Sequence, residues 1–343
     1  MPRQLIALLA GLSMATAGCG GTAPPPAAGL TSRTPSTAQR IDEATAARTF
    51  ASLAGLDRAW RERDCAAVVI ATAWVEKTLG GRACAATRNG RPAPSRTTYS
   101  EPAFLLPEEG GWFAALAGEP EPAYFVFVQA RDGWRLGFGP VPLTGSGSAT
   151  SPVATPGSAT STVATPGGST SSGATSFGAN SPGATSSGST SGGSTSGGGP
   201  DPATVRRARL VPQRHLTYLT DPAGLSGVRF PDADPVRKLR DELAAEPARV
   251  RPDRLTVDVE LLDVPRTIGA GASMLVFHTL RLTFRQRGAA HPRYGKADLR
   301  AFTGKSELDR LTGIELVSLV TELTPDNKVR TVALRRDLAD VRP

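Results

Sequence analysis

Three cysteines and three histidines are the residues of this sequence with the widest chemical range. A metal site or a nucleophilic centre needs several such side chains at short, defined spacings. Cys65 and Cys84 lie in a part of the chain that has no histidine, whereas His215, His278 and His291 are scattered through the second half. The spacing therefore predicts no metal site, no cofactor site and no cysteine nucleophile paired with a histidine.

His278 lies in a predicted strand, where it alternates in step with Leu280 and Leu282. A side chain at that parity points to the apolar side of the sheet, so we interpret His278 as a core histidine. The alternative is a general base that faces a cavity, with Asp258 or Glu260 as its partner. Both acids have the opposite parity to the apolar face of their own strand, which argues against such an arrangement. We therefore expect no catalytic residue and a protein that is not an enzyme.

Cys65 and Cys84 form an even pair in an oxidising compartment, and we predict a disulfide between them. A single straight helix from Cys65 to Leu79 would be about 21 Å long, and residues 80–84 could barely return across that span. The bridge therefore requires the helix to break. We expect the break near Ala73-Trp74, with Gly80-Gly81 turning the chain.

The first residues have the pattern of an export signal. Arg3 is followed by an apolar run from Leu5 to Ala15, which is shorter than the roughly 20 residues of a membrane span and suits a secretory signal. Thr16-Ala17-Gly18, directly before Cys19, resembles the lipobox of bacterial lipoproteins. That resemblance implies a signal peptide at 1–18, and a diacylglyceryl group on Cys19 that anchors the chain to the membrane. An ordinary cleaved signal with an incidental cysteine is the alternative.

Composition divides the rest of the chain. Residues 19–40 are rich in Gly, Pro, Ala, Thr and Ser, and this predicts a disordered tether. Residues 145–199 carry no charge and a single aromatic, Phe177, so they cannot bury enough apolar surface to offset the entropy of ordering them. We expect one domain at 41–143, a disordered linker at 144–200 and a second domain at 201–343. On this organisation the domains are tethered beads rather than a docked pair.

The basic residues are in excess, with 39 Lys and Arg against 31 Asp and Glu and a formal net charge of +8. By our count residues 41–143 hold 11 basic and 12 acidic residues, a net of −1, and residues 201–343 hold 25 and 19, a net of +6. This diffuse excess predicts a weak attraction to an anionic envelope polymer or lipid, centred on the arginine-rich stretches 206–209 and 249–254. No basic block is interleaved with aromatic residues and no finger spacing is present, so nucleic acid is not an expected partner.

In both regions that are expected to fold, the sequence predicts helices followed by an antiparallel meander. In the first, Phe50, Leu53 and Trp60 recur at helical spacing, and Asp64 is placed to cap a second helical stretch. Strands are expected there at 103–106, 111–116, 123–130 and 134–139, with Asp132-Gly133 as a hairpin signal.

In the second region, Asp234-Pro235 predicts the start of a helix whose apolar stripe ends at Pro247. Alternating residues predict strands at 255–261, 274–284, 314–323 and 329–335. The fold class is therefore α+β, with helices on one face of a curved antiparallel sheet in each domain.

Two segments carry a family resemblance. Residues 104–140 contain Gly111-Trp112-Phe113-Ala114-Ala115-Leu116 and Gly133-Trp134-Arg135-Leu136. They resemble actinobacterial lipoproteins built around a domain of unknown function, and residues 314–341 resemble the closing strands of the same proteins. The helix-then-meander order is also similar to the cystatin-like roll of nuclear transport factor two-like domains, which implies two such rolls and leaves activity open.

We therefore expect a lipid-anchored extracytoplasmic protein of the cell envelope with a non-enzymatic binding or scaffolding role. One alternative is a carrier whose roll cavity holds an apolar ligand, and another is a cavity enzyme that uses His278 as general base. Trp60, Trp112 and Trp134 have spacings that fit a core. In the carrier alternative, one of these tryptophans lines a pocket between helix and sheet.

Overall fold

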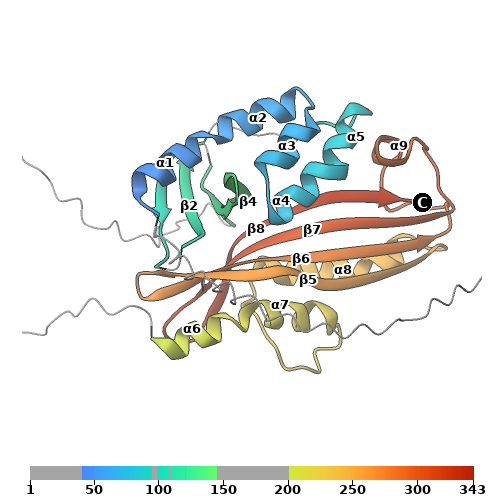
Figure 1. The fold of residues 1–343 in the computed structure, drawn as a ribbon. Helices are drawn as coiled ribbons and strands as arrows, with labels where there is room; N and C mark the ends of the chain where they lie inside the picture. Colours follow the sequence, from blue (N-terminus) through green and yellow to red (C-terminus); the bar gives the residue numbers. More distant parts are fainter. Residues whose placement is uncertain (1–40, 95–98, 109, 120, 145–200) are drawn as a thin grey trace, which may run out of the picture. The chain divides into compact units, whose positions relative to one another are not determined.

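The computed structural model describes residues 41–94, 99–108, 110–119, 121–144 and 201–343 (Figure 1). The expected signal peptide at 1–18, the tether at 19–40 and all but the first residue of the linker at 144–200 lie outside the described residues. Within the described residues, no helix is long and apolar enough to cross a membrane.

Residues 41–144 form a helical layer on a four-stranded antiparallel sheet of order β1-β2-β3-β4. The elements are α1 (Glu43–Ala51), α2 (Leu53–Arg61), α3 (Cys65–Ala71), α4 (Trp74–Thr78), the π-helical turn η1 (Leu79–Ala83), α5 (Cys84–Arg88), β1 (Ser100–Leu105), β2 (Trp112–Glu119), β3 (Ala123–Ala130) and β4 (Gly133–Pro142). All four expected strands are present. The carboxylate of Asp64 caps α3 by accepting a hydrogen bond from the backbone N–H of Ala67 at 3.0 Å, as predicted.

Residues 201–343 form a second antiparallel sheet, of order β5-β6-β7-β8, with its own helices. The elements are α6 (Pro202–Ala208), α7 (Val211–Thr220), α8 (Pro235–Arg249), β5 (Arg254–Ala270), β6 (Ser273–Arg287), α9 (Lys296–Thr303), β7 (Arg310–Leu323) and β8 (Val329–Arg342). Asp234 caps α8 through the N–H of Val236 at 3.0 Å. The helix does not end at Pro247 but continues to Arg249, because a proline in the last turn removes only one backbone hydrogen bond.

The two α+β domains predicted from the sequence are therefore present. In the first, α1–α3 cover one face of the sheet, and Phe50, Leu56 and Trp60 pack on Phe113 and Phe125. In the second, α6, α7 and α8 cover one face of the sheet formed by β5–β8. The second face of each sheet has no complete cover of its own helices; in the first domain, Val75 of α4 and Leu79 of η1 pack on part of it, beside Trp112.

These two remaining faces pack against each other, so the prediction of tethered beads is wrong. Phe277 of β6 contacts three aromatic rings of the first sheet, with centroid distances of 6.4 Å to Trp112, 5.8 Å to Tyr124 and 5.9 Å to Phe138. The physical reason is that β2 and β3 carry apolar side chains on both faces, and each face must be removed from water. The described residues of the two domains accordingly belong to one compact unit.

Polar contacts also join the two domains. Buried Glu76 in α4 forms an ion pair with Arg335 in β8, and Arg82 pairs with Asp340 at 2.8 Å. Asn89 donates to the backbone oxygen of Ala301 at 2.8 Å. The interface therefore combines an apolar centre with specific charged contacts along β8.

Candidate functional site

The Cys65–Cys84 disulfide is present, with the two Cα atoms 5.6 Å apart. The helix breaks where the bridge requires it, since α3 ends at Ala71 and α4 begins at Trp74. The expected turn at Gly80-Gly81 is wrong, because both glycines lie inside the π-helical turn η1.

Gly80 has a different role in the formation of this bridge. A Cβ atom at this position would lie 2.8 Å from Cγ1 of Val68, which is too close for a real contact. The missing side chain therefore lets η1 cross close to α3, and this crossing brings Cys84 to Cys65.

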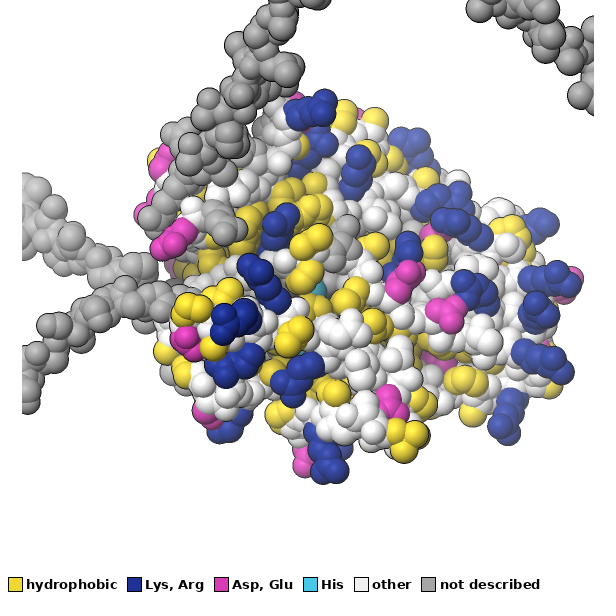
Figure 2. All heavy atoms as spheres, turned by 60° about the horizontal axis from the view of Figure 1, so that its bottom comes forward, with side chains coloured by type: hydrophobic (Ala, Val, Ile, Leu, Met, Phe, Trp, Pro, Cys, Tyr) yellow, Lys and Arg dark blue, Asp and Glu magenta, His cyan; other side chains and the backbone are white. Residues whose placement is uncertain are grey.

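Exposed arginines gather on one face of the second domain, where α6 and α7 meet solvent. We call Arg206, Arg207, Arg209, Arg214 and Arg229 the basic face; all five are exposed. Figure 2 turns the lower helices of Figure 1 toward the viewer, and shows Lys and Arg side chains spread over that side with fewer Asp and Glu. Among the described residues, no carboxylate lies within ion-pair distance of these arginines.

Two apolar side chains are exposed in the same stretch. Leu210, between α6 and α7, is 61% exposed, and Leu225, after α7, is 88% exposed. Arg206, Arg207 and Arg209 belong to the stretch for which the sequence predicted a weak attraction to an anionic polymer or lipid. Leu210 and Leu225 carried no sequence signal, because a single leucine in a polar segment is common on protein surfaces.

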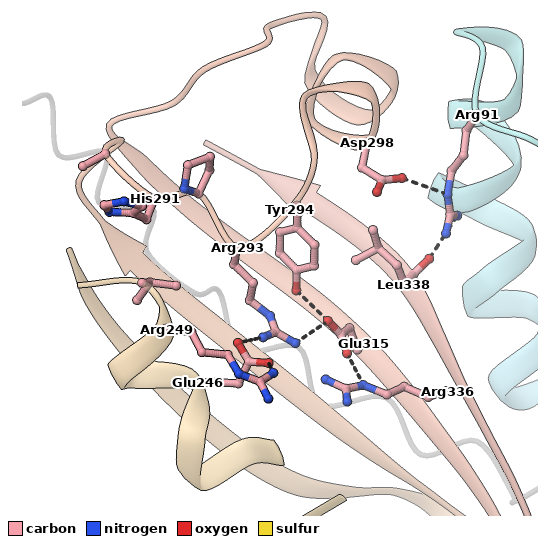
Figure 3. Close-up of a pocket in the computed structure, with 13 residues that line it drawn as sticks. Arg91, Glu246, Arg249, His291, Arg293, Tyr294, Asp298, Glu315, Arg336 and Leu338 are labelled. Carbon is pink, nitrogen blue, oxygen red and sulfur yellow. Dashed lines mark hydrogen bonds and ion pairs between the residues drawn. The ribbon is translucent and has the colours of Figure 1, made fainter. Parts of the chain in front are cut away.

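A hollow of about 790 Å³ opens beside α8, β7 and the segment between β6 and α9 (Figure 3). The guanidinium of Arg293 is almost fully buried there and forms ion pairs with Glu246 and, at 2.9 Å, with Glu315. Tyr294 donates its hydroxyl hydrogen to Glu315 at 3.0 Å, and Arg336 pairs with the same carboxylate. Each charged side chain at the centre of this hollow therefore forms an ion pair with a side chain of opposite charge.

The electrostatics of the hollow follow from this pairing. Burial lowers the pKa of Arg293, but the carboxylates of Glu246 and Glu315 outweigh it and hold the pKa above its ordinary value. Burial and the charge of Glu315 raise the pKa of Tyr294 well above its ordinary value. Both side chains keep their protons over the whole physiological range, so neither is suited to acid–base catalysis near neutral pH. The network instead ties α8 to the sheet.

The sequence contained one signal for this network. Glu315 has the strand parity of Val317 and Leu319, whose side chains are buried beneath the helices. A carboxylate at an apolar position of a strand needs a buried cationic partner, because an isolated buried charge is very costly. Arg293, in contrast, lies in a loop where no periodic pattern identifies it.

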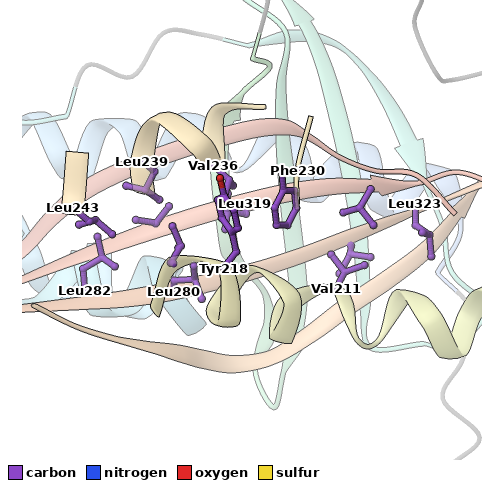
Figure 4. Packing of buried hydrophobic residues seen from close by; sticks show 14 of the residues in the cluster. Val211, Tyr218, Phe230, Val236, Leu239, Leu243, Leu280, Leu282, Leu319 and Leu323 are labelled. Atoms are coloured by element: carbon purple, nitrogen blue, oxygen red, sulfur yellow. The ribbon is translucent and has the colours of Figure 1, made fainter. Parts of the chain in front are cut away.

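The core beneath α7 and α8 is filled with side chains, as Figure 4 shows for α7, α8, β6 and β7. His278 points into this core and is 4% exposed, as its strand parity predicts. It lies against His215 of α7, with the ring centroids 4.9 Å apart. His291 is exposed at the edge of the charged hollow. The structure therefore brings two of the three histidines together, away from solvent.

Asp258 and Glu260 lie on the opposite face of the sheet from His278, as their parity predicts. Asp258 forms an ion pair with Arg285, and Glu260 forms one with Arg281. Both pairs run between β5 and β6 on the partly exposed side of the sheet. Neither carboxylate can act as a partner of His278.

Trp60 and Trp112 are buried core residues, 2% and 5% exposed. Trp134 is half-buried and lines a hollow of about 390 Å³ together with Ile70, which is 64% exposed. Trp134 thus borders a surface hollow between helix and sheet, and Trp60 lines another hollow, of about 260 Å³.

A further hollow, of about 310 Å³, lies between α1–α2 and the first sheet. We call it the aromatic groove, because its base consists of Phe50, Tyr99 and Phe125. The ring centroid of Phe125 lies 5.4 Å from that of Phe50 and 4.8 Å from that of Tyr99. The sequence predicted a helix that contains Phe50 and a strand that contains Phe125, whereas Tyr99 follows a loop and had no signal.

The walls and the rim of the aromatic groove come from α2. Leu53 and Ala54 form one wall, and Asp57, Arg58 and Arg61 lie at the rim. Arg61 pairs with Asp57 at 3.0 Å. No carboxylate of the described residues lies within ion-pair distance of Arg58, so the rim carries one uncompensated positive charge.

Among the described residues, no group of three or more His, Cys, Asp and Glu side chains is arranged to hold a metal ion. No family model, no curated protein and no solved structure matches this chain. Among the described residues, the basic face, the charged hollow and the aromatic groove are features that could contact another molecule.

Proposed function

We propose that this chain is a lipid-anchored protein of the extracytoplasmic face of the membrane, with a non-enzymatic binding or scaffolding role in the cell envelope. One observation carries the proposal. Cys65 and Cys84 are joined in a disulfide, which favours an oxidising compartment and leaves Cys19 as the one cysteine outside the bridge. Cys19 directly follows Thr16-Ala17-Gly18, the segment that resembles a lipobox.

The placement of the titratable groups supports a non-enzymatic role. His278, the candidate general base, is enclosed by the core, and neither of its ring nitrogens has a hydrogen-bond partner among the described residues. The acids of the charged hollow are neutralised by arginines. A general base must reach a substrate and must change its protonation near the working pH, and neither group is placed to do so.

The basic face supplies the partner of this proposal, the anionic surface of the membrane itself. Residues 201–230 contain five arginines and two aspartates, which by subtraction gives a net charge of +3. Each cation near an anionic bilayer contributes about 1 kcal/mol of attraction, and exposed Leu210 and Leu225 can enter the headgroup region. The basic face would then orient the folded unit that the acyl chains hold nearby.

Mass spectrometry of protein extracted from its native membranes tests the anchor. We expect an intact mass that corresponds to cleavage before Cys19 plus a diacylglyceryl group, and a gain of two hydrogens on reduction of the disulfide. The matched control is Cys19→Ala, which should remain unlipidated and keep the same response to reduction. A soluble, unlipidated native chain would overturn the lipoprotein proposal.

Vesicle sedimentation tests the basic face separately, with the secreted Cys19→Ser chain so that no acyl group contributes. We expect binding to phosphatidylglycerol vesicles, weaker binding to phosphatidylcholine vesicles, and loss of binding at high salt because the charges are screened. Arg206→Glu with Arg209→Glu should abolish the binding. The control pair is Arg300→Glu with Arg310→Glu, two exposed arginines outside the basic face. Equal losses in both pairs would overturn the assignment of this face.

A further inference from the structure

We propose that the aromatic groove binds the single hydrocarbon chain of an anionic amphiphile, such as a fatty acid, with Arg58 facing the carboxylate. This inference goes beyond the lipid anchor and the basic face, and it depends on neither. The groove lies on the first domain, under α1 and α2, whereas the basic face belongs to α6 and α7 of the second domain. The aromatic groove is therefore a ligand site separate from the basic face.

The base of the aromatic groove is apolar and rigid. Phe50 and Phe125 are 7% and 1% exposed, and Phe50 also packs edge-to-face on Phe127, with the ring centroids 6.2 Å apart. These two rings expose little surface and form a fixed floor, whereas half-buried Leu53 and Tyr99 present the accessible apolar surface of the groove. A preformed apolar surface binds hydrocarbon without the entropic cost of ordering its own side chains.

The size of the groove selects the class of apolar ligand. Its volume of about 310 Å³ lies at the lower end of the range of roughly 300–1,000 Å³ for small-molecule sites. That space suits one unbranched chain of moderate length. A phospholipid with two acyl chains needs more, so the groove is not matched to an intact bilayer lipid.

The charge at the rim selects the polar end of the ligand. Asp57 is occupied by Arg61 at 3.0 Å, so it neither repels an anion strongly nor offers a free site for a cation. Arg58 has no such partner among the described residues, and it lines the same groove. A ligand with one negative charge next to its apolar chain can pack the chain on the rings and pair the charge with Arg58.

Titration with dodecanoate, present as a monomer and followed by calorimetry, tests the proposal on the secreted Cys19→Ser chain. We expect saturable binding at one site. In the series octanoate, decanoate, dodecanoate, the dissociation constant should fall about fourfold for each added methylene until the groove is full. Dodecyltrimethylammonium, which has a similar chain and the opposite charge, should bind more weakly.

Two substitutions locate the site. Ala54→Trp places an indole in the groove and should weaken dodecanoate binding at least about tenfold. Its control is Ala47→Trp, an exposed position on α1 that does not line the groove and should leave binding unchanged. Arg58→Gln should weaken dodecanoate about two- to fivefold, as expected for an exposed charge pair, and should leave dodecanol unaffected. Circular dichroism checks that each variant is folded.

The proposal is overturned if dodecanoate shows no saturable binding up to about 1 mM, or if Ala54→Trp and Ala47→Trp bind it equally well. Equal effects of Arg58→Gln on dodecanoate and dodecanol would overturn the role of Arg58. None of these results bears on the lipid anchor, which is read from the mass of the native protein. Vesicle binding, in turn, responds to the basic face and not to Ala54 or Arg58.

Discussion

The imidazole rings of His215 and His278 lie 4.9 Å apart, tilted by 47° to each other, inside the core of the second domain. Nδ1 of His215 is 3.1 Å from the backbone oxygen of Val211, and its Nε2 is 3.2 Å from Oγ1 of Thr331. Neither ring nitrogen of His278 has a hydrogen-bond partner among the described residues. Two adjacent imidazoles in such a place are stable only when both are neutral.

Protonation of this pair should destabilise the fold. Burial lowers the pKa of His215 to about 4, and burial together with the neighbouring His215 lowers the pKa of His278 well below its ordinary value. Between about pH 4 and pH 6.5 the unfolded chain therefore binds more protons than the folded chain. The free energy of unfolding should fall as the pH drops through this window, by up to about 1 kcal/mol per pH unit for each histidine. Urea unfolding at a series of pH values measures this fall in the free energy of unfolding.

His278→Leu should make that dependence shallower and should raise the free energy of unfolding near pH 5, because it removes a buried base with no hydrogen-bond partner. The control is His291→Ala, since His291 is exposed and lies outside the core that holds His215 and His278. A steeper pH dependence in His278→Leu, or an equal change in His291→Ala, would contradict this account.

The buried ion pair between the domains should respond very differently to single and double substitution. Arg335→Met removes a cationic partner of the buried carboxylate of Glu76, which is 1% exposed, and should cost about 3–5 kcal/mol. Glu76→Gln combined with Arg335→Met should recover a large part of that loss, since both charges of this ion pair are then absent. The exposed pair Lys296–Glu307 is the comparison, and Lys296→Met should cost at most about 1 kcal/mol. Thermal unfolding of the unchanged chain and of these three variants measures the differences in the free energy of unfolding.

The docking of the two sheets predicts cooperative unfolding. Because Phe277 joins three aromatic rings of the other domain, the chain should unfold in one calorimetric transition rather than two. Phe277→Ala should lower its free energy of unfolding by about 3–5 kcal/mol. Phe302→Ala is a second test of the docking, since that ring lies in the cluster where α9 meets Ala83 and Ala86 of the first domain. Two well-separated transitions in the unchanged chain would argue against the docked arrangement.

The elements of this fold could be predicted because their signals are local. The strand β3 was placed at its observed bounds, and Asp64 and Asp234 were identified as helix caps, since alternation and capping involve neighbouring residues. The break before Trp74 followed from the geometry of one disulfide. The helix α9, by contrast, is only 8 residues long and gave too short a pattern.

The packing of the two domains could not be predicted in the same way, because it depends on contacts between residues far apart in the chain. Trp112–Leu116 and Ala123–Val128 are apolar on both faces, which is typical of a sheet covered on both sides. This pattern indicates that a second cover exists but does not identify it. The aromatic groove is equally nonlocal, since Tyr99, Phe50 and Phe125 come from a loop, a helix and a strand.

Loss of the Cys65–Cys84 bridge should weaken the fold through the unfolded state. The bridge closes a loop with a sequence separation of 19, and the chain-entropy relation gives about 3 kcal/mol for a loop of that size. Cys65→Ala with Cys84→Ala should lower the free energy of unfolding by about this amount, and a reducing agent should then have no further effect. Cys19→Ala is the matched control, because Cys19 is outside the bridge, and it should leave the free energy of unfolding unchanged. If the double variant were as stable as the unchanged chain, the close packing of Val68 on Gly80 would hold α3 against η1 without the bridge.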